Sequence, residues 1–210
     1  MIRPARVIAL ALLTGLLGGS CDRSVPIELE DRRLTPPEDV DLGTDPWRGR
    51  RRMDVDQLRA SIARVTGGLA WEVSGVDQLS RFSETLGVPD YARDTAEDLQ
   101  PSLLFLKFLD DAARSVCRRL VDAEQTAPAE ARVFFTALDP SVQSPPPAAV
   151  RENLAALLLR YHGRLLEPED RAIDPWVELL ESAAVEDAAP ARAWEAVCVA
   201  LIDHPDFFTY

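Results

Sequence analysis

The sequence predicts an all-α protein, an orthogonal bundle of about six helices that follows a signal peptide and a tether. Three observations predict this fold class. Apolar residues recur at helical spacing in several segments, alternation with a period of two residues is scarce, and proline or glycine marks the ends of the segments. About 160 residues remain after the tether, which is enough for one domain with a hydrophobic core.

The first 21 residues have the organisation of a secretory signal peptide. Arg3 and Arg6 precede any acidic residue, and an almost unbroken apolar run follows from Val7 to Leu17. Small residues then lead directly to Cys21. Because the apolar run is too short to cross a bilayer, we expect export of the protein rather than a membrane span.

Small residues that end on a cysteine resemble the lipobox of bacterial lipoproteins, with Gly18 where that family usually has leucine. The resemblance implies that Cys21 becomes the lipidated N-terminus. The mature protein would then be anchored by acyl chains and face the periplasm or the cell surface. Gly18 and Ser20 also satisfy an ordinary signal peptidase, so the alternative is a secreted soluble protein that begins with cysteine.

The charge of the chain argues against nucleic acid as a partner. Without its signal peptide the chain keeps 21 basic and 35 acidic side chains, a net charge of −14. Such a surface repels phosphate backbones. Long basic segments that would bind anionic lipids are also missing, so we expect membrane contact through the acyl chains on Cys21 alone.

A linker rich in proline and acidic residues covers 22–51, and a single helical domain is expected over 52–210. Asp54 and Gln57 have the spacing of a capping box, which predicts a helix from there to the glycines that follow Val65. A second, shorter helix is predicted over 76–86.

The strongest helical pattern runs from Pro101 to about Gln125 and predicts the packing centre of the domain. Ion pairs at i,i+4 spacing, Lys107–Asp111 and Asp110–Arg114, mark its solvated face. Its apolar stripe consists of Phe105, Leu109, Ala112, Val116 and Leu120.

Three further helices are predicted in the C-terminal half of the chain. The first follows the proline run 145–147 and ends at Gly163, the second is capped by Asp174, and the third begins at Pro190. The short apolar segment 133–138 leaves a strand and a helical turn equally open.

The sequence predicts no cofactor, haem or metal, because it lacks their usual motifs. His162 and His204 are interpreted as residues at helix C-termini, where the exposed carbonyls favour an imidazolium. The weaker alternative is a metal site that joins both histidines to Asp203 or Asp206. No nucleophile elbow of G-x-S-x-G form and no glycine-rich phosphate loop occur.

Two cysteines remain once Cys21 is assigned to the lipid. Cys117 and Cys198 each lie on the apolar face of a predicted helix, and export favours a disulfide between them. The alternative is a pair of buried free thiols.

Both ends of the domain show a low-specificity resemblance to uncharacterised exported bacterial proteins associated with c-type haem domains. The N-terminal part is Arg51-Arg52-Met53 with the helix to Gly67, and the C-terminal part is 193–210. The resemblance implies no activity, and this chain lacks the haem motif.

Three aromatic residues, Phe207, Phe208 and Tyr210, end the chain. They could fold back on the bundle as a structural latch, or stay exposed as a docking patch for a partner.

The function predicted from these observations is an accessory or binding role in the bacterial envelope, without a recognisable catalytic site and with an envelope protein as partner. The alternative is an envelope enzyme whose active site is assembled from dispersed residues.

Overall fold

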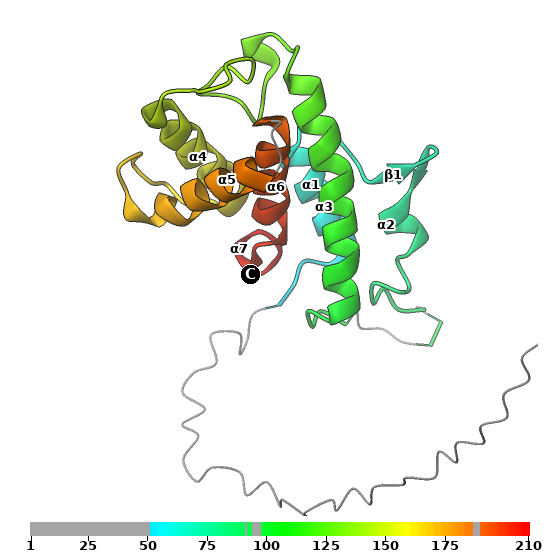
Figure 1. Cartoon of the computed structure of the whole chain (residues 1–210). Coiled ribbons are helices and arrows are strands. Elements are labelled where there is room, and N and C mark those ends of the chain that lie inside the picture. Colours follow the sequence, from blue (N-terminus) through cyan, green and yellow to red (C-terminus); the bar gives the residue numbers. More distant parts are fainter. Residues whose placement is uncertain (1–50, 91, 94–97, 187–189) are drawn as a thin grey trace, which may run out of the picture. The chain divides into compact units, whose positions relative to one another are not determined.

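The computed structural model describes residues 51–90, 92–93, 98–186 and 190–210, which all belong to one compact unit (Figure 1). The predicted all-α class is confirmed, and the β-structure in this part of the chain consists of a two-stranded sheet and an isolated antiparallel bridge between Arg52 and Thr209. In chain order the elements are α1 (Val55–Val65), β1 (Glu72–Val73), β2 (Val76–Asp77), α2 (Gln78–Arg81), α3 (Leu103–Glu124), α4 (Pro147–His162), α5 (Asp174–Glu186), α6 (Pro190–Asp203) and α7 (Pro205–Phe208). Short 3-10 helices occur at Ala129–Ala131 and Arg171–Ile173.

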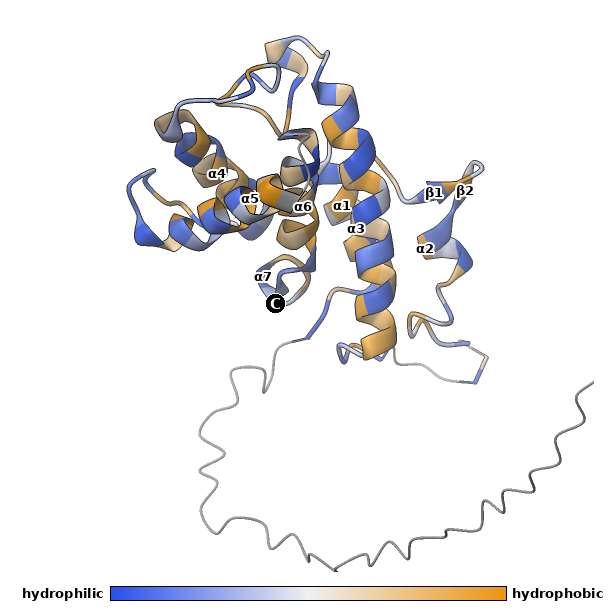
Figure 2. Ribbon diagram, in the orientation of Figure 1, coloured by the Kyte–Doolittle hydropathy of each residue, from blue (hydrophilic) through white to orange (hydrophobic). Residues whose placement is uncertain are grey.

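The packing centre is the pair α3 and α6, which run side by side (Figure 1). The predicted stripe of α3, from Phe105 to Leu120, is buried along its whole length. From α6, Val197, Leu201 and Ile202 face the same core, and α5 packs on α6. Figure 2 shows hydrophilic residues on the visible side of α3 and a hydrophobic first turn, where Leu103 is 87% exposed. Within the described residues, no helix is both long enough and apolar enough to span a bilayer.

Local sequence signals set most helix ends. Asp54 and Gln57 form the predicted capping box of α1, with Gln57 N donating to Asp54 Oδ1 at 2.7 Å. Gly163 ends α4 in the left-handed region at φ 68°, where a side chain would be strained. Asp174, predicted as an N-cap, is instead the first residue of α5, because a 3-10 turn capped by Asp170 precedes it.

The helix predicted over 76–86 is largely wrong. A hairpin of β1 and β2 turns at Ser74 and Gly75, both with positive φ, and only Gln78–Arg81 is helical. The side chain of Asp77 ends the strand and caps the short helix, accepting hydrogen bonds from Leu79 N and Ser80 N. The cap sets the start of the helix at Gln78, and turns from Phe82 to Gly87 replace the rest of the expected helix.

Segment 133–138 is neither a strand nor a helical turn. Its backbone N–H groups bind two buried side chains instead of a neighbouring backbone. The carboxylate of Glu124 accepts hydrogen bonds from the N–H groups of residues 133–135 at 2.7–3.1 Å, and Asn153 Oδ1 accepts from those of 136 and 137. These bonds place Phe134 and Phe135 against Trp194 of α6.

Arg52 joins the start of the domain to its centre. Its side chain is 1% exposed, donates to Met53 O at 2.9 Å and to Leu86 O at 2.5 Å, and lies 4.7 Å from the centre of the Phe105 ring. The guanidinium is well suited to this position because it can satisfy several carbonyls at once.

Candidate functional site

A groove with a volume of about 640 Å³ lies along α6. Small side chains, Ala196, Val199 and Ala200, form its apolar part. Charged and polar residues surround them, namely Arg114, Arg192, Glu195, Asp203 and His204, and Pro205 completes the lining. An apolar surface with a few polar groups around it is typical of a binding site.

One carboxyl group of the groove, Asp203, lies near a second carboxyl group, that of Asp110 on α3. The Asp110 carboxylate accepts a hydrogen bond from Arg114 Nε at 2.9 Å. Burial raises the pKa of Asp203 to about 7, the Asp110 charge acts in the same direction, and Arg114 opposes it. The i,i+4 pair Asp110–Arg114 is confirmed, but its contact with α6 could not be read from the spacing.

Glu195 forms the opposite edge of the groove. Its side chain is only 11% exposed, and it accepts from Arg118 Nε at 3.2 Å and from Arg192. The groove therefore contains fixed charges of both signs rather than a field of one sign.

A cluster of aromatic rings adjoins the groove where α6 meets α7. The His162 and His204 rings stack with centroids 4.6 Å apart, and Trp176 of α5 lies 5.6 Å from the first and 5.9 Å from the second. The three side chains come from α4, α5 and the junction of α6 with α7. Only the fold brings them together, because no short motif contains them.

The two histidines have different roles. His162 ends α4, as predicted, and its Nε2 lies 2.9 Å from Leu201 O. Burial lowers its pKa, and the hydrogen bond with Leu201 opposes this effect. His204 directly follows the last residue of α6, as predicted, and its side chain also caps the N-terminus of α7 by accepting from Asp206 N at 3.1 Å.

The residues of the weaker metal alternative are neighbours in the fold. His162, His204 and Asp206 each offer a ligand atom within 4.8 Å of the other two, whereas Asp203 contacts Asp110 instead. The missing sequence motif argued against a metal here. A short motif can identify only ligands that are close in the sequence, so its absence does not count against a site whose ligands come from different helices.

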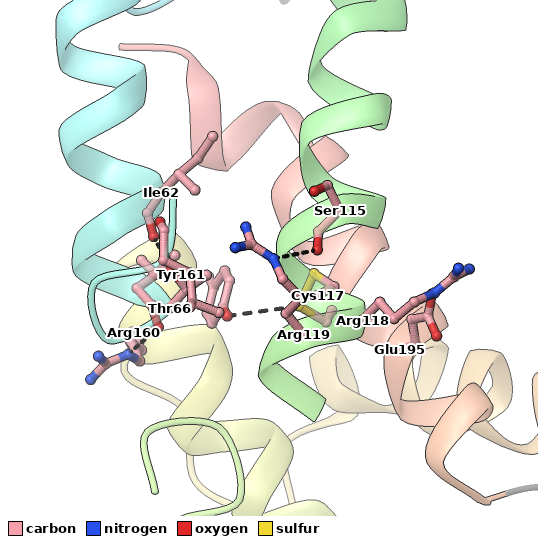
Figure 3. Close-up of a disulfide and its surroundings, with 12 residues drawn as sticks. Ile62, Thr66, Ser115, Cys117, Arg118, Arg119, Arg160, Tyr161 and Glu195 are labelled. Carbon is pink, nitrogen blue, oxygen red and sulfur yellow. Dashed lines mark hydrogen bonds and ion pairs between the residues drawn. A yellow bond between two sulfur atoms is a disulfide. The ribbon is translucent and has the colours of Figure 1, made fainter. Parts of the chain in front are cut away.

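The predicted disulfide between Cys117 and Cys198 is present at the α3–α6 contact (Figure 3). Both residues are fully buried, and their Cα atoms are 5.7 Å apart. The hydroxyl of Tyr161 lies 3.9 Å from Cys198 Sγ, and burial holds the pKa of this phenol well above its usual range. The bond thus lies in an apolar interior, as expected of a structural disulfide.

The C-terminal aromatic residues separate into two groups. Phe207 and Phe208 are 3% exposed, and Phe208 packs 5.6 Å from Phe105, whereas Tyr210 is 63% exposed. Two backbone bonds join Arg51 to Tyr210, and Met53 N donates to Phe208 O at 2.7 Å. The end of the chain is therefore tied to the start of the domain, and Tyr210 is the one of the three rings available to a partner.

Comparison with known proteins adds no family to these observations, because no protein-family model, curated protein or solved structure matches the chain. The predicted lipidation residue, Cys21, lies outside the described residues.

Proposed function

We propose that the protein is an exported, lipid-anchored accessory protein of the bacterial envelope that binds a partner protein through the groove along α6. The buried Cys117–Cys198 disulfide supports the export part of this proposal, because such bonds persist in oxidising compartments and are rare in the cytosol. The signal-like first 21 residues supply an independent reason for export.

The groove supports a binding role through its chemistry. Its apolar part consists of small side chains of α6, so a protruding side chain of a partner could enter between them. Arg114, Arg192 and Glu195 lie around this surface, each already in an ion pair, and give it a rim of both charges. An apolar centre within a polar rim is the usual anatomy of a protein–protein interface.

The anchor is tested by metabolic labelling. Labelled palmitate should enter the wild-type protein and should not enter Cys21→Ser. Equal labelling of the two proteins, or no labelling of the wild type, would contradict the anchor.

The groove is tested separately, by cross-linking in intact cells followed by purification from solubilised envelopes. Ala200→Leu places a larger side chain in the groove, whereas Ala184→Leu makes the same change at an exposed position of α5 outside it. We expect Ala200→Leu to lose a cross-linked partner that Ala184→Leu retains. A partner retained equally by both variants would show that binding occurs elsewhere.

A further inference from the structure

His162 has a nitrogen that the fold leaves without a partner. Its Nε2 lies 2.9 Å from Leu201 O, and a carbonyl oxygen can only accept, so in the neutral ring the proton is on Nε2. The lone pair is then on Nδ1, which is buried and has no hydrogen-bond partner. A buried acceptor without a donor is costly, and binding of a cation there would remove this cost.

The tautomer of His204 is determined in a similar way. Its Nδ1 accepts the N–H of Asp206 at 3.1 Å, so this nitrogen also carries a lone pair. The same atom lies 3.8 Å from Asp206 Oδ2. One ligand atom of each of His162, His204 and Asp206 lies within 4.8 Å of the other two, where the end of α4 meets α7.

We propose that His162, His204 and Asp206 form a binding site for a divalent transition-metal ion such as Zn²⁺. Both histidines would bind through Nδ1 and the aspartate through its carboxylate, with water completing the coordination. Two nitrogen ligands and one oxygen ligand suit Zn²⁺, Cu²⁺ or Ni²⁺, whereas Ca²⁺ and Mg²⁺ prefer sites built of oxygen.

The surroundings of His162 are those of a metal ligand. Donation of the second ring N–H to a backbone carbonyl, here Leu201 O, orients the ring and strengthens its other nitrogen as a ligand. Trp176 covers both imidazole rings on one side. An ion can reach the site from solvent, because His162 and Asp206 line a groove of about 550 Å³.

Metal binding requires a small closure of the site. The ligand atoms lie within 4.8 Å of one another, and tetrahedral bonds of about 2.0–2.1 Å bring ligand atoms to about 3.3 Å. His204 would exchange its hydrogen bond from Asp206 N for the metal. α7 has only four residues and lies near the chain end, so it is the element best able to shift.

This inference goes beyond the proposed function and does not depend on the lipid anchor or on the partner. A protein that fails to incorporate palmitate could still bind Zn²⁺, and an acylated protein could fail to bind it. The two proposals can therefore fail separately.

The test uses purified protein without a polyhistidine tag. The ligand variants are His162→Gln, His204→Asn and Asp206→Asn, and Asp122→Asn removes an exposed carboxylate of α3 as a control. Asparagine at position 204 keeps a side-chain oxygen that can cap α7. Equilibrium dialysis against micromolar Zn²⁺, followed by elemental analysis, gives the number of ions bound per chain. Melting curves recorded with Zn²⁺, with Mg²⁺ and with a chelator show whether metal binding stabilises the folded protein.

We expect one Zn²⁺ per chain and a higher melting temperature with Zn²⁺, but not with Mg²⁺, for the wild type and Asp122→Asn. Each ligand variant should bind at least tenfold more weakly and lose the shift. No stoichiometric Zn²⁺ in the wild type would overturn the proposal. Undiminished binding by the folded double variant His162→Gln/His204→Asn would overturn it as well. The Zn²⁺ stoichiometry of the wild type therefore tests the proposal even if a variant fails to fold.

Discussion

Cys117 and Glu124 lie two turns apart on the same face of α3, yet they connect the chain in opposite ways. Cys117 is bonded to Cys198 inside an apolar contact between two helices. Glu124 is equally inaccessible at 4% exposure, but it holds an irregular segment through hydrogen bonds to backbone N–H groups. One face of α3 thus carries a disulfide in an apolar contact and a buried carboxylate that binds backbone N–H groups. Substitution of the two should lower the free energy of unfolding by different amounts.

The largest expected effect is the loss of the disulfide. It closes a loop with a sequence separation of 81, for which the chain-entropy model gives about 4.5 kcal/mol of stabilisation. The double variant Cys117→Ala/Cys198→Ala should lose about this free energy of unfolding in urea titrations. Reductant should destabilise the wild type and leave the variant unchanged. Similar sensitivity of both proteins to reductant would contradict a structural role of the bond.

Substitution of Glu124 should have the next largest effect. Glu124→Ala leaves the N–H groups of residues 133–135 without their acceptor, and unsatisfied buried donors cost about 1–3 kcal/mol each, so we expect a loss of about 3 kcal/mol after partial hydration. Asp122→Ala, an exposed position of the same helix, should change stability by less than about 0.5 kcal/mol. A loss equal to that of the control would show that Glu124 does not hold the segment.

The two positions also differ in how far the sequence predicts them. The helical stripe that ends at Leu120 predicted α3, and two cysteines in a chain that begins with a signal-like segment predicted the disulfide. Glu124 gave no such signal, because a glutamate at a helix end is normally solvated. Its role depends on a loop that returns over the helix, and such long-range polar contacts have no local periodicity.

The candidate site shows the same limit. The sequence provided His162, His204 and Asp206 as one possible set, but the absence of a metal motif argued against it. Their proximity depends on α7 returning to α4 and on Trp176 of α5 covering the rings, which are tertiary contacts. The error at residues 76–86 is different, because there a local cap and a turn with positive φ outweighed helical spacing.

Asn153 provides a neutral comparison with Glu124, because its Oδ1 accepts from Thr136 N at 3.0 Å and from Ala137 N at 3.1 Å. Asn153→Ala should cost about 2 kcal/mol, less than Glu124→Ala, because fewer donors lose their acceptor and none loses a charged one. Its exposed neighbour offers the control Glu152→Ala. If Asn153→Ala costs more than Glu124→Ala, the charge of Glu124 does not strengthen its bonds. Urea unfolding of the variants provides the comparison.

Asp77 extends the comparison to a carboxylate near the surface, where the smallest effect is expected. It also accepts backbone N–H bonds, from Leu79 and Ser80, but its side chain is 28% exposed. Asp77→Ala should therefore cost about 1 kcal/mol at neutral pH, the usual value for an N-cap.

The stabilisation by Asp77 should also depend on pH. Partial burial acts to raise the pKa of Asp77, but hydrogen bonds from Ser80 and the nearby Arg59 guanidinium outweigh it and hold the pKa below its usual value. A carboxyl group whose pKa is lowered in the folded state contributes its stability above the pKa of the unfolded chain, about 3.9, and loses it as the pH falls through the folded value. The difference between wild type and Asp77→Ala should thus be constant from pH 7 to about pH 5 and shrink in stronger acid. Urea unfolding at a series of pH values measures this, and a difference that grows on acidification would contradict it.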